Sequence, residues 1–519
     1  MFSNSLRINI SKDKLYLISA FSLLLILFHL FANAFTNYGI FRDELYYIAC
    51  SKRLAAGYVD QPPFSIYVLY IIRIIFGDSL FAIRFLPAVL SGLTVFLVGI
   101  ITNEMGGGKI AITIASIAVT LTPVYLGLNT IYSMNCIDLF LWAFAYLIVL
   151  RLMKSEDKRL WFLLGLVFGI GLLNKISMGW FIAGFYIAFA LTEKRKYYKT
   201  IYPWLTAVIA LIIFSPFIIW NITHNFAHLE FIRNASSEKY SGLTRLDFVK
   251  DLIFTMDPIS IIVWLPGVFY YFFNKNGKNF IQLGIIFLTT FLILLVNPHT
   301  QAYYMTPAML ILFPAGSILI DRLSEKRLFA YVKYSIIVLL ILTAVLTPFA
   351  LPLLPVKRYI AYAESFGIKP STAEGKKLTR LPQFYADMFG WQKFAETVST
   401  VYQSVPDSEK AVTVVYTSNY GEAGAIEYYS KKYSLPAVIC PQNNYWYWGL
   451  EHSHLNKVKN VIVVGGTMKD LQKVFGTVDS SAVFRCQYCM PYENNQTIFI
   501  GSDAHVSLMK IFIRNKRFI

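Results

Sequence analysis

The stretch NYGIFRDELYYIACSKRLAAGYVDQPPF, residues 37–64, follows directly on the first long apolar segment of the chain. It carries Arg42, Asp43 and Glu44 in succession, and Asp60 stands just before a pair of prolines. Acidic groups at the mouth of a membrane helix cost free energy unless they face a cavity, a partner or water. The stretch is therefore a candidate functional site, and the alternative is a solvated loop with an ordinary salt bridge.

The composition of the 519-residue chain is that of a polytopic membrane protein. Hydrophobic residues make up 56% and charged residues 15%, whereas a soluble domain carries about a quarter charged residues. The formal net charge is +17, but no basic and aromatic platform for nucleic acid accompanies it, so nucleic acid is not expected as a partner. Five cysteines in so long a chain do not make a disulfide framework.

About eleven apolar stretches are close to the length needed to cross a bilayer, which is about 20 residues. The first covers residues 15–35 and the last covers residues 331–353. The stretch 65–76 is too short to cross and carries Arg73, which predicts an interfacial or re-entrant helix. The expected fold class is a polytopic α-helical membrane protein.

The basic residues of the chain predict its orientation. Lys12 precedes the first span, and the connectors 154–159 and 193–199 are short and rich in Lys and Arg, whereas the loop 129–135 has none. By the positive-inside rule the N-terminus then lies in the cytoplasm. An odd number of spans places everything after Pro352 outside. We therefore expect a multi-pass protein of the plasma (inner) membrane.

The tail of the chain changes character from about Val356, where apolar runs shorten and charges return. Residues 411–417 and 460–466 are predicted strands, and residues 421–433 and 468–475 are the helices predicted to follow them. This alternation indicates a small α/β domain. The expected division is a transmembrane domain, residues 1–355, with a first outer loop, residues 37–79, and an extracytoplasmic domain, residues 356–519.

Two further features of the tail have alternative interpretations. The turn 418–425, SNYGEAGA, could hold a phosphate at a helix N-terminus, but it lacks the full dinucleotide fingerprint, and a plain strand–helix turn is favoured. Cys486 and Cys489 form a C-x-x-C without a second pair at zinc-ligand spacing. A local disulfide, or one with Cys440, is favoured in an oxidising compartment. A thioredoxin-like role is disfavoured because Pro491 argues against a helix from the first cysteine.

Further polar residues fall near membrane level on the predicted outer side. Each has an ordinary alternative: two histidines four apart can pack on lipid headgroups, two adjacent tyrosines can anchor an aromatic belt, and one lysine can snorkel alone. The residues are Asp138, His224, His228, Tyr303, Tyr304 and Lys175.

Several of these segments resemble one enzyme superfamily. Residues 41–64, 229–235 (LEFIRNA) and 302–307 (AYYMTP), with NYGEAGAIEYY and CQYCMPYEN in the tail, are similar to the bacterial branch of the protein O-mannosyltransferases. These are glycosyltransferase family 39-type membrane enzymes with the GT-C fold, related to the lipid A aminoarabinose transferases. The resemblance spans nearly the whole chain.

The resemblance implies an inverting glycosyltransferase. Such an enzyme moves a monosaccharide from a polyprenyl-phosphate donor to a hydroxyl of a cell-envelope lipid, glycan or protein on the outer face of the membrane. Asp43, in the family's Asp-Glu pair, is the implied base for the acceptor hydroxyl. Arg233, Tyr304 and, as a third candidate, Tyr58 match positions near the donor phosphate. The supporting acidic residues are Glu44 and Asp138.

A divalent metal is left open by the resemblance, and no other cofactor is implied. Asp60 stands where the aminoarabinose transferases carry an acidic metal ligand before Lys-Pro, and His228 is the second candidate ligand. This chain has Gln61 in place of that lysine, and Gln301 where many relatives have lysine. Both departures weaken the transfer of phosphate-binding and metal-binding details to this chain.

Two other classes of protein are weighed against this interpretation. A transporter tends to show paired broken helices in two internal repeats near the middle of the bilayer, and the sequence has no such repeat. A non-catalytic envelope-assembly protein would explain the outer domain but leaves the pair Asp43 and Glu44 without a role.

Overall fold

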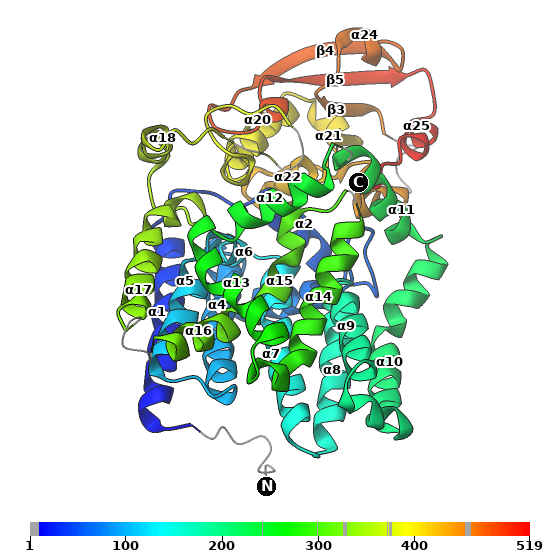
Figure 1. Cartoon of the computed structure of the whole chain (residues 1–519). Helices are drawn as coiled ribbons and strands as arrows, with labels where there is room; N and C mark the ends of the chain where they lie inside the picture. The colour runs from blue at the N-terminus through cyan, green and yellow to red at the C-terminus, as the bar shows by residue number, and fades with distance from the viewer. Residues whose placement is uncertain are drawn as a thin grey trace. The chain divides into compact units, whose positions relative to one another are not determined.

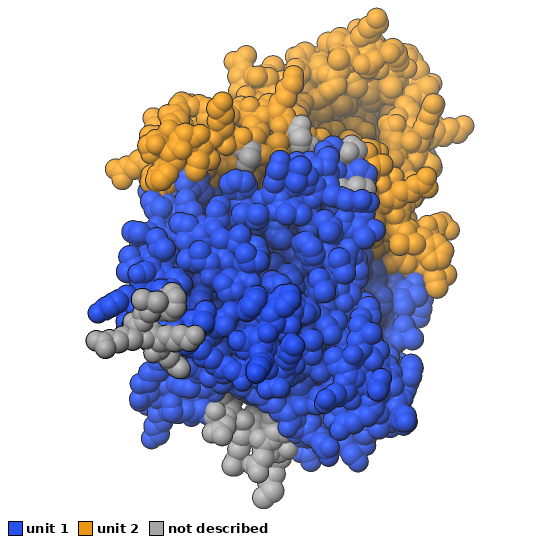
Figure 2. All heavy atoms as spheres, viewed as in Figure 1, with its two compact units in different colours: residues 1–36, 76–220, 240–354 blue, residues 37–75, 221–239, 355–519 orange. Residues whose placement is uncertain are grey.

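A computed structural model of the chain describes residues 10–240, 242–297, 299–324, 330–370, 372, 376–451 and 458–519. The chain divides into two compact units, which Figure 2 shows in different colours. The first unit comprises residues 1–36, 76–220 and 240–354, and the second comprises residues 37–75, 221–239 and 355–519.

The first unit is helical, as expected for apolar segments that must satisfy every backbone polar group internally. Among the described residues, six helical segments are long and apolar enough to cross a membrane. They are α1 (Lys12–Phe35), α4 (Leu80–Glu104), α7 (Met134–Lys154), α10 (Tyr202–Thr223), the segment Gly277–Val296 that ends in α14 (Ile281–Val296), and the segment Val332–Phe349 that begins with α17 (Val332–Leu342).

Two further helix pairs are bent. The helix α12 (Arg245–Thr255) meets the segment Pro258–Phe273, which contains α13 (Ile261–Phe273), at 90°. The segment Ala302–Met309 meets α16 (Leu312–Leu323) at 56°. If each bent pair counts as one span, the described residues hold up to eight.

The predicted count of about eleven spans is not confirmed. Three of the stretches counted as spans form shorter helices, α5 (Lys109–Leu121), α8 (Arg159–Asn174) and α9 (Met178–Ala190). Helices of 13 and 16 residues extend about 20 and 24 Å, against about 30 Å of hydrocarbon. Hydropathy measures composition and does not reveal where a helix stops. The predicted orientation in the membrane stays a prediction.

The second unit contains a five-stranded sheet with the order β2-β1-β3-β5-β4, of which Figure 1 shows β3, β5 and β4 side by side. The strand β1 pairs in parallel with β2 and β3, whereas β5 is antiparallel to β3 and β4. The bounds are β1 (Thr413–Tyr416), β2 (Val438–Ile439), β3 (Asn460–Val464), β4 (Phe475–Phe484) and β5 (Gln496–Ala504).

The two predicted strands coincide with β1 and β3, but the sheet is larger than predicted. All five residues of β3 are buried, which is typical of a central strand. The helix predicted over residues 468–475 is only one turn, α24 (Met468–Leu471), and Phe475 begins β4. The strand β4 lies at the edge of the sheet, and most of its residues between Phe475 and Phe484 are exposed, so its sequence lacks the apolar alternation that predicts a strand.

The helices of the second unit include two segments from outside the tail. The helices from outside the tail are α2 (Arg42–Ser51), α3 (Phe64–Phe76) and α11 (Ala227–Asn234). The helices of the tail are α18 (Val356–Ser365), α20 (Trp391–Gln403), α22 (Tyr420–Tyr433), α23 (Asn444–Glu451) and α25 (Leu508–Arg514), together with shorter turns. The predicted helix 421–433 coincides with α22.

Two glycines allow α2 and α22 to pack closely. A Cβ atom on Gly421 would overlap the side chain of Arg42, and a Cβ atom on Gly424 would lie 2.8 Å from the Cβ atom of Leu45. Small residues one turn apart on a helix let two backbones approach each other closely. The first turn of α2 is therefore held against the N-terminal half of α22.

We expect the substitution Gly424→Ala to destabilise the second unit. Overpacking lowers the free energy of unfolding by about 1–3 kcal/mol, whereas the better helix propensity of alanine raises it by about 1 kcal/mol. Thermal unfolding in detergent should therefore begin a few degrees lower. Gly179→Ala on α9 is the matched control, because a Cβ atom there meets only an ordinary contact at 3.9 Å. Equal melting temperatures for the two variants would contradict the close-packing argument.

Candidate functional site

The N-terminus of α2 is capped by a buried carboxylate. The Oε2 atom of Glu44 accepts a hydrogen bond from the N–H of Phe41 at 2.9 Å, and Glu44 is fully buried. Phe41 has no side-chain acceptor, so this bond satisfies one of the orphan N–H groups of the helix, and the charge also suits the helix dipole. Glu44 therefore has a structural role in starting α2.

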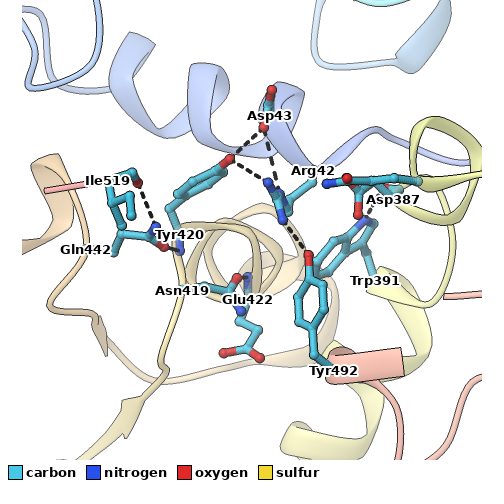
Figure 3. A network of polar contacts seen from close by, with 11 residues as sticks. Arg42, Asp43, Asp387, Trp391, Asn419, Tyr420, Glu422, Gln442, Tyr492 and Ile519 are labelled. Carbon is cyan, nitrogen blue, oxygen red and sulfur yellow. Dashed lines mark hydrogen bonds and ion pairs between the residues drawn. The ribbon is translucent and has the colours of Figure 1, made fainter. Parts of the chain in front are cut away.

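Asp43 points away from this cap and is the more accessible carboxylate. Its side chain is 41% exposed, its Oδ1 atom accepts a hydrogen bond from the hydroxyl of Tyr420 at 2.8 Å, and it lies 3.8 Å from Nε of Arg42 (Figure 3). Adjacent residues of a helix point about 100° apart, which explains the different surroundings of Asp43 and Glu44. The exposed carboxylate is held on one side by protein groups.

Arg42 is the centre of the polar network in Figure 3. Its side chain is largely buried, at 11% exposure, and donates hydrogen bonds to the hydroxyls of Tyr492 at 2.6 Å and Tyr420 at 3.0 Å. Its guanidinium carbon lies 5.1 Å from the ring centroid of Tyr420, a cation–π geometry. Its backbone N–H donates to the carbonyl oxygen of Asp387 at 3.1 Å. Three segments of the tail, around Asp387, Tyr420 and Tyr492, thus fix the first turn of α2.

Tyr420 connects the arginine with the aspartate. Because the Arg42 guanidinium can only donate, the Tyr420 oxygen accepts from it and directs its own proton to Asp43. The Oδ1 atom of Asn419 accepts the N–H of Glu422 at 3.0 Å and caps α22. The N-terminus of α22 therefore has its own cap and lies against Arg42, which supports a plain strand–helix turn rather than a phosphate site.

Asp60 lies in a second network of the same unit. Its Oδ1 atom accepts a hydrogen bond from the hydroxyl of Tyr46 at 2.9 Å. The Oδ1 atom of Asn444, from α23, accepts the N–H of Val59 at 2.7 Å and lies 3.3 Å from the same tyrosine hydroxyl. Burial raises the pKa of Asp60 to about 7, although the bond from Tyr46 opposes this. Asp60 is thus half protonated near neutral pH.

His228 is close to this second network. Its Nδ1 atom lies 2.9 Å from the carbonyl oxygen of Val59, so Nδ1 carries the proton, and burial lowers the pKa of the ring. In the described part of the chain, no group of three or more His, Cys, Asp or Glu side chains could hold a metal. The pair Asp60 and His228 therefore does not make a ligand set by itself.

The two donor-phosphate candidates of the second unit have different surroundings. The hydroxyl of Tyr58 donates to the carbonyl oxygens of Arg53 and Cys50 at 3.0 and 3.2 Å and accepts the N–H of Ala55 at 3.2 Å. The hydroxyl of Tyr58 therefore stabilises the loop in which it lies, through backbone groups of residues 50–55. Arg233 is exposed in the last turn of α11, and its guanidinium has no hydrogen bond or ion pair to any described residue. Arg233 is thus available for an anionic ligand.

Asp138 belongs to the first unit and is buried, with 1% of its surface exposed. Its Oδ2 atom accepts a hydrogen bond from Ser177 Oγ at 3.1 Å and lies 3.7 Å from Nζ of Lys175. The same ammonium donates to Oδ1 of Asn135 at 2.8 Å. A charge buried at the end of α7 is thus paired and hydrogen-bonded, as burial requires.

Lys175 is not the lone snorkelling lysine that its sequence context suggests. It is 8% exposed, paired with Asp138, and its Nζ atom lies 5.5 and 5.2 Å from the ring centroids of Tyr303 and Tyr304. Burial at this depth is stable because the charge has a carboxylate, an amide and two aromatic faces around it.

The predicted site residues therefore divide between the two units. The second unit holds Asp43, Glu44, Tyr58, Asp60, His228, Arg233, Cys486 and Cys489, and the first holds Asp138 and Tyr304. Sequence reasoning missed the tail residues that contact the first outer loop, namely Tyr420, Tyr492 and Asn444. The available signal was the glycine pair of α22, which indicates a close helix contact without identifying the partner.

Comparison with known proteins agrees with the predicted resemblance. Residues 60–220 match the sequence family described as dolichyl-phosphate-mannose-protein mannosyltransferase. The crystal structure of ArnT from Cupriavidus metallidurans bound to undecaprenyl phosphate superposes with a TM-score of 0.60, at 11% identity, over 95% of this chain and 98% of that chain. The predicted resemblance is confirmed.

The apo structure of the same ArnT gives a TM-score of 0.58, at 10% identity, over 93% of this chain and 97% of that chain. A search among curated protein sequences gave no match. At such low identity the ArnT comparison establishes the fold. The chain has a GT-C-like fold with apolar helices and a small C-terminal sheet domain, as the sequence predicted, whereas the predicted number of spans is not confirmed.

We expect the carboxyls of Asp60 and Glu422 to reduce the stability of the protein as the pH rises from 5 to 8. Burial raises the pKa of Asp60 and of Glu422 to about 7, whereas carboxyls of the unfolded chain titrate near 4. Between these values the folded state binds protons that the unfolded state releases, so the free energy of unfolding falls as the pH rises from about 4 to about 7.

Melting temperatures in detergent at pH 5 and pH 8 test this expectation. The variants Asp60→Asn and Glu422→Gln should each reduce the difference between the two temperatures. Glu396→Gln is the matched control, because this glutamate is 49% exposed, and it should leave the difference unchanged. An unchanged difference in both the Asp60→Asn and the Glu422→Gln variants would contradict the expectation.

Proposed function

We propose that this protein is an inverting membrane glycosyltransferase. It moves a monosaccharide from a polyprenyl-phosphate donor to a hydroxyl of a cell-envelope lipid, glycan or protein on the outer face of the membrane. The observation that carries the proposal is the accessible carboxylate of Asp43, held by Tyr420 and Arg42 at the start of α2. The family matched by residues 60–220 and the fold shared with an ArnT structure that holds undecaprenyl phosphate support it.

Asp43 is the proposed general base. The acceptor oxygen attacks the anomeric carbon while its proton passes to the carboxylate, the bond from that carbon to the phosphate oxygen breaks, and the configuration inverts. The leaving phosphate is already an anion, so no general acid is required. Tyr420 donates to Oδ1, which leaves Oδ2 to receive the proton. Tyr420 is therefore a positioning residue, and holding the base in place lowers the entropy cost of the reaction.

Arg233 is the proposed contact to the donor phosphate in the second unit. A guanidinium matches a phosphate with two parallel charge-assisted hydrogen bonds, and this one is exposed without a protein partner among the described residues. Tyr58 is left out because its hydroxyl already has backbone partners. In the first unit, Tyr304 is kept as a second phosphate candidate on the resemblance alone, and Asp138 as a supporting residue.

Asp43→Asn should lower turnover by roughly 10²–10⁴ fold with little change in donor affinity, because the amide keeps the shape but cannot take a proton. Transfer of a labelled sugar from a polyprenyl-phosphate donor in reconstituted vesicles gives the turnover. Glu44→Gln is the control, since its amide oxygen can still accept from Phe41, and it should show a mild defect. An inactive Glu44→Gln beside a near-normal Asp43→Asn would show that the base is misassigned.

Arg233→Ala should weaken donor binding by about 1.5–3 kcal/mol, because a charge-assisted contact to phosphate is lost. Titration of the purified protein with the polyprenyl-phosphate lipid measures the dissociation constant directly. Arg245→Ala is the matched control, because Arg245 is another exposed arginine, and its side chain donates to just one described group, the carbonyl of Val296 at 3.4 Å. Equal losses of affinity in both variants would mean that the effect is general charge attraction to an anionic lipid.

A further inference from the structure

The segment between β4 and β5 brings two cysteines together in one tight turn. The N–H of Cys489 donates to the Sγ atom of Cys486 at 3.2 Å, and the Cys489 thiol donates to the carbonyl oxygen of Cys486 at 3.5 Å. The N–H of Cys486 donates to Oδ1 of Asn494 at 2.8 Å, which fixes the other side of the turn. Both cysteines are free thiols in this structure.

The two thiols differ in exposure and in acidity. Cys486 is partly exposed, whereas Cys489 is 1% exposed. Hydrogen bonding from Cys489, whose N–H donates to the Cys486 sulfur, lowers the pKa of Cys486 to about 7, and the pairing of the two thiols raises the pKa of Cys489. Thiol–disulfide exchange requires an accessible thiolate that attacks first and a nearby second thiol that resolves the mixed disulfide. Cys486 and Cys489 meet these two requirements.

A glycine keeps room beside the first sulfur. Gly390 precedes α20 with a φ of +92°, and a Cβ atom there would lie 2.9 Å from the Sγ atom of Cys486. Both the space and the backbone conformation therefore exclude other residues at this position. The ring of Tyr488, between the two cysteines in sequence, packs on Phe389 at 5.8 Å. The turn of residues 486–489, called the dithiol turn below, thus packs against the turn that precedes α20.

The same segment continues to the arginine of the candidate site. Tyr492, three residues after Cys489, accepts the hydrogen bond from Arg42. Glu493 is buried, neither of its carboxylate oxygens has a hydrogen bond in the described part of the chain, and burial raises its pKa, which nearby Arg42 opposes. Only Met490 and Pro491 separate the dithiol from these two groups. The dithiol turn is therefore separated by two residues from Tyr492, a hydrogen-bond partner of Arg42.

We propose that Cys486 and Cys489 form a thiol–disulfide exchange site for a small-molecule disulfide, and that its oxidation state controls the contact between Tyr492 and Arg42. The Cys486 thiolate, its proton released to water, attacks one sulfur of the disulfide and expels the first thiolate. The sulfur of Cys489 then loses its proton, attacks the sulfur of Cys486 and expels the second. The two cysteines lose two electrons, the reagent disulfide gains them, and two free thiols leave.

The exchange can be measured on the full-length protein in detergent, equilibrated with buffers of oxidised and reduced glutathione in varied ratio. Acid quenching, alkylation and mass spectrometry then report each cysteine. We expect a reversible disulfide between Cys486 and Cys489. Cys489→Ser should accumulate glutathione on Cys486, whereas Cys486→Ser should leave Cys489 unmodified. Cys440→Ser is the control and should not change the titration, because Cys440 is buried.

Three outcomes would overturn the exchange site. They are a disulfide that reduced glutathione does not open, a disulfide that includes Cys440, and a Cys489 that reacts before Cys486. Iodoacetamide at pH 7 gives an independent check. Cys486 should react at least about tenfold faster than Cys489, because at its pKa half of the thiol is thiolate whereas an ordinary thiol is only a few per cent ionised.

The coupling to Arg42 has its own measurement. Amide hydrogen exchange of peptides covering residues 41–45 should differ between the oxidised and the reduced protein. Tyr492→Phe should keep the glutathione titration but lose this difference, because the acceptor of the arginine is gone. Identical exchange of residues 41–45 in both states would refute the coupling. No glycosyl transfer enters these tests, so their outcome is independent of the proposed function.

Discussion

The close approach of α2 and α22 is the contact on which the second unit depends. Tyr420 and Arg42 are 378 positions apart in the chain, yet a hydrogen bond joins them. This is feasible because Gly421 and Gly424 have no Cβ atom to separate the two helices. The first turn of α2 then has a fixed direction, and Asp43 receives its partner from the far end of the chain. The absence of side chains at Gly421 and Gly424 thus allows the contact that holds Asp43, the candidate base.

The second unit also contains charged and titratable side chains that are largely removed from solvent. The positive charge of Arg42 is balanced by tyrosine hydroxyls and a carboxylate. Burial raises the pKa of the carboxyls of Asp60 and Glu422 to about 7. A carboxyl that is half protonated at neutral pH can donate as well as accept a hydrogen bond. The polar contacts of this unit therefore respond to pH through these carboxyls. By our inference, they also respond to the oxidation state of Cys486.

Local patterns explain what could be predicted from the sequence. Asp43 and Glu44 were recognised because they directly follow an apolar run, and β3 because five apolar and β-branched positions stand together. The roles of Tyr420, Tyr492 and Asn444 depend on contacts between distant segments, which no local pattern encodes. The pairing of Lys175 could not be predicted for the same reason, since its partner Asp138 lies on another helix.

The short helices of the first unit have a consequence for the lipid around them. The apolar helices α8 and α9 contain 16 and 13 residues, or about 24 and 20 Å, which is less than the hydrocarbon thickness of about 30 Å. If these helices cross the membrane, a hydrophobic mismatch of this size can be relieved by local thinning of the bilayer, at a fraction of a kcal/mol per Å. Lipid headgroups beside these helices would then sit deeper than in the bulk membrane. A lipid that carries its sugar on a phosphate would be drawn to the same depth.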